Sequence, residues 1–235
     1  MRPYLIAAAA FIAFLALAIS DVFTTSATTD EGVHLASGLS YRSGDYRLNP
    51  EHPPLLKRFA TLFVAQPSFD GAAQARQKVD EAWAGAESDA MAQWTYSHYT
   101  LWGLRDSHFG AATTELPPKS AWVADAPAMF TRARLTMLAC GVALALLVFF
   151  WSRALWGAWG AALSAALFCL DPNFIAHSGL VTTDVGVSLF MFAAVFFLWR
   201  ALQRFTVVDV TGFAIAFGCA QAAKFSAILL LPIVV

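Results

Sequence analysis

The sequence predicts an all-α polytopic membrane protein with about five transmembrane helices and a large, partly helical first loop. Hydrophobic residues make up 58% of the 235 residues and charged residues 13%, against roughly 45–50% and about 25% in soluble domains. Five apolar stretches approach the roughly 20 residues that a helix needs to cross a bilayer core. The charges lie mainly elsewhere, since 10 of 15 Lys/Arg and 13 of 16 Asp/Glu fall between Asp21 and Arg134.

The apolar stretches are separated by residues that end helices. Trp156-Gly157 predicts a short turn between the second and third stretches, and Asp171-Pro172-Asn173 ends the third, because proline cannot continue a helix. The five predicted spans are Tyr4–Ser20, Ala133–Trp151, Ala154–Leu170, Leu180–Trp199 and Val210–Val235.

These stretches divide the chain into three parts. We expect a first transmembrane helix in residues 1–20, a loop with interfacial helices in residues 21–131, and four further transmembrane helices in residues 132–235. The last apolar run has no polar tail, so we expect the chain to be incomplete at its C-terminus.

Arginines in the short connections predict the orientation. Arg2, Arg153, Arg200 and Arg204 fall on one side of the membrane if every stretch spans, and that side should be cytoplasmic. The long loop then faces the extracytoplasmic side of the cell (inner) membrane. The first stretch also resembles a cleavable signal peptide ending near Ala16-Leu17-Ala18, and either interpretation places Asp21 onward outside.

The loop itself has helical patterns. After Pro53-Pro54, apolar residues at helical spacing between Leu55 and Phe63 predict an interfacial amphipathic helix with Lys57, Arg58 and Thr61 on its polar face. Residues 71–91 predict a solvated helix rich in alanine and charge.

Two adjacent carboxylates, Asp30 and Glu31, follow the first span. A carboxylate near the bilayer surface suits a general base, because burial raises its pKa towards the working pH. The alternative is that both acids cap a helix that starts after Thr28-Thr29.

The histidines and cysteines indicate no conventional metal site. Cys140, Cys169 and Cys219 lie in apolar runs without CxxC spacing and fit packing roles. His52 is expected to shape the His-Pro-Pro turn or the acceptor pocket. A divalent cation as cofactor is left open, and a net charge of −1 argues against a nucleic-acid partner.

Four motifs carry a resemblance to a known family. The Asp30-Glu31 pair, HPPLLK at 52–57, DPNFIAHSGLVTTD at 171–184 and AAKFSAILLLP at 222–232 resemble the GT-C superfamily of glycosyltransferases. The closest resemblance is to glycosyltransferase family 39, whose relatives include protein O-mannosyltransferases and lipid A aminoarabinose transferases. It implies the N-terminal part of a GT-C fold, a polyprenyl-phosphate-linked sugar donor, and Asp30 as base with Glu31 beside it. Family members are usually longer, so parts of the donor and acceptor sites are expected to lie beyond this chain.

Charges in or near the spans fit this resemblance. Lys224 lies about 21 Å along a helix from Val210, at about 1.5 Å per residue, where its ammonium would bind a lipid-linked phosphate or snorkel to the surface. Asp184 begins the fourth span as a site residue or a helix cap. Arg132 and Arg134 precede the second span as interfacial anchors or as contacts to the donor phosphate.

The resulting hypothesis is an inverting membrane glycosyltransferase that acts on a protein or glycolipid acceptor, with membrane lipids as its surroundings. The alternatives are a non-catalytic lipid-binding or transporter-like protein, with Lys224 and Asp184 as a buried ion pair, and a non-catalytic relative that assembles with a partner.

Overall fold

The structure, a computed structural model, describes residues 1–66, 80–81, 84, 90–102 and 125–234. Within these residues it is helical and contains no strand. The protein is therefore an all-α polytopic membrane protein. The helix expected over residues 71–91 falls almost entirely outside the described residues.

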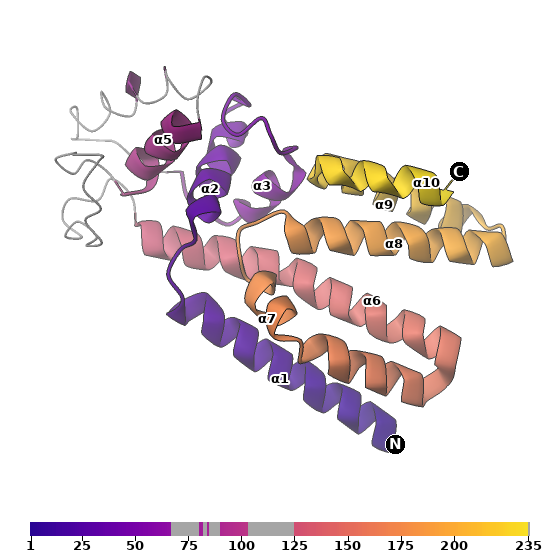
Figure 1. Cartoon of the computed structure of the whole chain (residues 1–235). Helices are drawn as coiled ribbons and strands as arrows, with labels where there is room; N and C mark the ends of the chain where they lie inside the picture. Colours follow the sequence, from indigo (N-terminus) through magenta and orange to yellow (C-terminus); the bar gives the residue numbers. More distant parts are fainter. Residues whose placement is uncertain (67–79, 82–83, 85–89, 103–124, 235) are drawn as a thin grey trace.

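Among the described residues, three helices are long and apolar enough to cross a membrane: α1 (Arg2–Thr24), α6 (Ala126–Cys169) and α8 (Asp184–Gln203). A shorter apolar helix, α9 (Val207–Ala223), packs against α8. Helix α6 also contacts both α1 and α8, so these four helices form one continuous bundle (Figure 1).

Helix α6 contains two of the predicted spans, joined at a sharp kink. Gly157 has φ 69° and ψ −164°, a backbone conformation that glycine adopts because it has no Cβ. The predicted turn at Trp156-Gly157 is confirmed, and the second arm of α6 runs back from the kink (Figure 1). The predicted stop is also confirmed: α6 ends before Leu170, and α7 (Pro172–Ser178) follows, with the Asp171 carboxylate accepting from Phe174 N at 2.8 Å.

The prediction of one continuous span over Val210–Val235 is wrong. Helix α9 ends at Ala223, and Lys224 is extended, with φ −156° and ψ 139°. A 3₁₀ segment, η2 (Phe225–Leu230), and α10 (Leu231–Val234) then turn back along α9 (Figure 1). The break agrees with the high cost of carrying a lysine through a hydrocarbon core, since it leaves Lys224 at the end of α9 instead of inside a span.

The polar elements gather at one end of the bundle. Helices α2 (Thr29–Arg42), α3 (Leu55–Ala60) and α5 (Ala90–Trp102) lie there, at the upper left of Figure 1. The N-terminus, the α6 kink and the α8–α9 turn lie at the other end. The four arginines used to predict orientation belong to this second end, since they begin α1, precede the kink, or lie where α8 ends.

Lys57 and Thr61, which were predicted to lie on the polar face of an interfacial helix at α3, are buried instead. Lys57 is 1% exposed and Thr61 is fully buried, whereas Phe63 is 73% exposed. Helix α3 packs against α2, α6 and α9, so its polar side faces protein instead of water. Gly38 makes the close α2–α3 approach possible, because a Cβ there would lie 2.2 Å from the carbonyl oxygen of Lys57.

Candidate functional site at one end of the helix bundle

A buried ion pair joins the start of α2 to α6. Thr28 caps α2, and the Glu31 side chain accepts from its backbone N–H at 2.9 Å, which is a capping box. Glu31 is fully buried and accepts from Arg134 Nε and Nη2 at 2.8 and 2.7 Å. Val181 N adds a further bond at 2.9 Å. The carboxylate thus connects α2, α6 and the segment before α8.

The Arg134 guanidinium is saturated by these contacts. Its remaining donors reach the carbonyl oxygens of Val22, Thr25 and Ser26 at the end of α1 and after it, at 3.3, 2.9 and 2.9 Å. Burial raises the pKa of Glu31, but hydrogen bonds from Arg134, Thr28 and Val181 outweigh burial and lower the pKa overall. Glu31 is therefore held as an anion. The hypothesis that the two acids cap α2 is confirmed for Glu31.

On the same end of the bundle, five residues form a polar cluster: Asp30, His34, His52, Asp184 and Lys224. Lys224 Nζ lies 2.6 Å from Asp184 Oδ1, with side chains 28% and 52% exposed. The rings of His34 and His52 are 5.3 Å apart and nearly perpendicular. The cluster combines α2, the turn before α3, the start of α8 and the end of α9.

The pKa of His52 is influenced by neighbouring charges of both signs. Burial lowers its pKa, Lys57 and Lys224 lower it further, and Glu51 and Asp184 oppose that effect. His52 is thus close enough to feel both members of the Lys224–Asp184 pair. We expect its imidazole to be neutral at pH 7.

Within the cluster, His34 is held in one orientation. Its Nδ1 lies 2.9 Å from the Val181 carbonyl oxygen, which can only accept, so Nδ1 carries the proton and Nε2 is the acceptor of the neutral ring. Burial lowers the pKa of His34, the bond to Val181 and the charge of Asp30 raise it, and His52 and Lys57 lower it.

The structure brings together four of the predicted site residues: Asp30, His52, Asp184 and Lys224. Two others, Glu31 and Arg134, pair with each other instead. Arg132 is exposed on α6.

His34 was not among the predicted site residues. The available signal was its spacing of four residues from Asp30, which places both on one side of a helix. Within the residues that the structure describes, no group of three His, Cys, Asp or Glu side chains is arranged to hold a metal ion.

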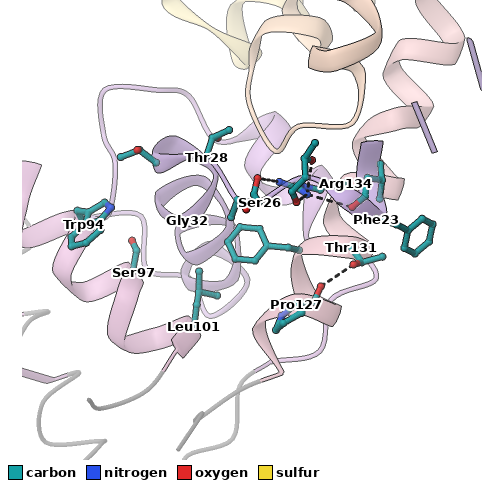
Figure 2. Close-up of a pocket in the computed structure, with 15 residues that line it drawn as sticks. Phe23, Ser26, Thr28, Gly32, Trp94, Ser97, Leu101, Pro127, Thr131 and Arg134 are labelled. Carbon is teal, nitrogen blue, oxygen red and sulfur yellow. Dashed lines mark hydrogen bonds between the residues drawn. The ribbon is translucent and has the colours of Figure 1, made fainter. Parts of the chain in front are cut away.

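A cavity of about 560 Å³ lies at the same end of the bundle (Figure 2). It is bounded by the end of α1, the start of α2, α5 and the start of α6, and none of the five cluster residues lines it. Thr29 and Gly32 turn one side of α2 towards the cavity, and Arg134 forms part of its wall. Arg134 thus forms part of the cavity wall and at the same time pairs with Glu31 of α2.

Comparison with known protein families matches residues 117–235 to the dolichyl-phosphate-mannose-protein mannosyltransferase family. No curated protein and no solved structure matches the chain.

Proposed function

The chain belongs to the dolichyl-phosphate-mannose-protein mannosyltransferase family, a family of membrane glycosyltransferases, and we propose that it moves a sugar from a polyprenyl-phosphate donor to an extracytoplasmic acceptor hydroxyl with inversion. The observation that carries this proposal is the polar cluster. The charge of Asp30 acts on His34, and the His34 ring lies 5.3 Å from the His52 ring. His52 in turn is influenced by the charges of the Lys224–Asp184 pair, where α9 ends and α8 begins. A lipid-linked anion would reach such a place from the bilayer.

Asp30 is suited to be the general base. Its side chain is exposed at the first turn of α2, and no hydrogen bond to it is found among the described residues, so its lone pairs are open to an acceptor hydroxyl. The acceptor oxygen would form a bond to the anomeric carbon while its proton passes to Asp30. The bond from that carbon to the phosphate oxygen would break, leaving its electron pair on the lipid phosphate.

Lys224 is suited to stabilise the charge that develops on this phosphate. Fixed cations opposite a leaving group stabilise the transition state more than the ground state. The ion pair with Asp184 holds Lys224 Nζ at the end of α9, and its exposure allows a phosphate oxygen to approach. His52 is close enough to Lys224 and Asp184 to contact a donor or acceptor bound beside them.

Glu31 and Arg134 have a supporting role in this proposal. The Glu31 carboxylate is fully buried and already accepts from two residues besides Arg134. It is therefore less accessible to an acceptor than the neighbouring Asp30. The pair fixes the start of α2, and so the direction of Asp30.

The transporter-like alternative needed a buried Lys224–Asp184 pair within the membrane. The pair is instead partly exposed at the ends of α8 and α9. This arrangement favours binding at the end of the bundle over passage through it.

The decisive substitution is Asp30→Asn. We expect transfer to fall by about 10²–10⁴-fold, because the amide cannot take the acceptor proton, while insertion and stability stay unchanged because the side chain is exposed. Sugar transfer is measured in membranes from a polyprenyl-phosphate sugar. Asp45→Asn, which alters an exposed ion pair with Arg47, is the matched control. Near-normal transfer by Asp30→Asn would refute the base assignment.

A further inference from the structure

Lys57 in α3 is a buried cation whose partners are all uncharged. It is 1% exposed, and none of the acids that the structure describes forms an ion pair with it. Its Nζ donates to Tyr41 Oη, Asn49 O and His52 O at 2.7 Å each, and to Asn49 Oδ1 at 3.0 Å. These partners belong to α2 and to the turn before α3.

The acceptors around Nζ favour the ammonium form, whereas burial opposes it. The Tyr41 hydroxyl donates its own proton to the Leu48 carbonyl oxygen at 2.5 Å, so it must accept from Lys57. Four acceptors thus surround three protons, whereas a neutral amine has only two. Burial lowers the pKa of Lys57 to about 7. A buried charge is costly, and an apolar side chain of similar length would fill the same space without that cost.

The turn that Lys57 holds is strained. Asn49 has φ 54°, a left-handed conformation that costs energy in a residue with a Cβ. Its backbone N–H donates to Gln93 Oε1 at 2.8 Å, and its side-chain amide donates to Glu51 at 3.0 Å. Gln93 Nε2 also donates to Glu51 at 2.9 Å. Contacts from α2, α3 and α5 therefore hold this backbone, and His52 follows three residues after it.

We propose that Lys57 is a positioning residue, whose ammonium fixes the Asn49 turn and so holds His52 beside His34 and near Lys224. This role rests on the proposed function, because it matters for transfer only if the polar cluster is the active site. Lys57 does not line the cluster itself. It acts through the His52 carbonyl, to which it donates directly.

A positioning role and a mere packing role differ in what happens to the two imidazoles. Burial is the largest influence on the pKa of both His34 and His52, and the charge of Lys57 lowers both further. If Lys57 positions His52, removing the ammonium shifts both titrations upward. Loss of the Lys57 charge has this effect by itself, so positioning is distinguished by a variant that keeps the charge and loosens only its hold on the turn, and a mere packing role would leave His52 unchanged in that variant.

The test uses the complete protein in nanodiscs, labelled with ¹³C/¹⁵N-histidine and titrated by NMR. His34→Gln and His52→Gln assign the two signals. In Lys57→Met we expect both pKa values to rise by about one pH unit, the effect of a nearby unit charge at intermediate dielectric. We also expect kcat to fall by about 10²-fold, as for a misplaced site residue, with KM for the donor little changed.

Arg58→Met is the matched control. It removes a neighbouring charge of the same helix that is exposed and donates to Tyr46 Oη, and it should leave both titrations in place. Tyr41→Phe separates positioning from the loss of charge, because it keeps the Lys57 ammonium but deletes one acceptor of Nζ and the tie to Leu48. We expect it to change the His52 signal and titration.

An unchanged His52 signal and titration in Tyr41→Phe would overturn the inference, and so would unchanged His34 and His52 titrations in folded Lys57→Met. An equal shift in Arg58→Met would do the same. The titrations need no substrate, so they separate this inference from the proposed function. A wild-type protein without transfer activity would refute the function and leave the titration result to decide the role of Lys57.

Discussion

Replacing Glu31 with glutamine should destabilise the protein far more than an exposed charge substitution. The carboxylate is fully buried, and it accepts two bonds from Arg134 and one each from the backbone N–H groups of Thr28 and Val181. Glutamine keeps the shape, but its NH₂ group would face donors, and Arg134 would remain charged and buried. Removing one partner of a buried pair costs about 3–5 kcal/mol.

The measurement is equilibrium unfolding in mixed micelles, with the free energy of unfolding taken from circular dichroism. Asp45→Asn provides the comparison, since the Asp45–Arg47 pair is exposed and should contribute at most about 1 kcal/mol. A double substitution, Glu31→Gln with Arg134→Met, should cost less than the sum of the two single changes. If Glu31→Gln is no more destabilising than Asp45→Asn, the account of this pair as the anchor of α2 is refuted.

Three further predictions concern Lys224, Gly157 and Lys57. Lys224→Met should weaken binding of a polyprenyl-phosphate donor in nanodiscs while folding is kept, and Lys224→Arg should retain part of the affinity because the charge survives; unchanged affinity in Lys224→Met would exclude the phosphate role. Gly157→Ala should cost about 1–3 kcal/mol of unfolding free energy, because its φ of 69° and ψ of −164° suit only glycine. Gly218→Ala, where a Cβ meets nothing within 4 Å, should be silent, and equal effects would refute the strain argument. Burial lowers the pKa of Lys57 from 10.5 to about 7, so between these pH values the unfolded chain binds a proton that the folded chain does not. Wild-type stability should therefore rise relative to Lys57→Met from pH 7 to pH 10 in the same unfolding assay, and a constant difference would contradict this linkage.

Much of the membrane architecture could be predicted from the sequence, because hydropathy and helix termination are local properties. The turn at Gly157 and the stop at Asp171-Pro172 follow from residues whose backbone preferences act within one or two positions. The Thr28–Glu31 capping box is similarly local, with its partners three residues apart. The resemblance rests on short motifs, and the match over residues 117–235 to the dolichyl-phosphate-mannose-protein mannosyltransferase family agrees with it at the level of GT-C-type membrane glycosyltransferases.

The pairing of the polar residues was decided only by the tertiary structure. Glu31 and Arg134 are 103 residues apart, so no local pattern shows that they neutralise each other and leave Asp30 as the accessible acid. The hydropathy pattern places Lys57 on the polar face of its helix. The oxygens that accept from its Nζ belong to Tyr41 and Asn49, which lie in other segments. A lysine is buried where folding supplies enough acceptors to replace water, and that supply depends on which helices pack together.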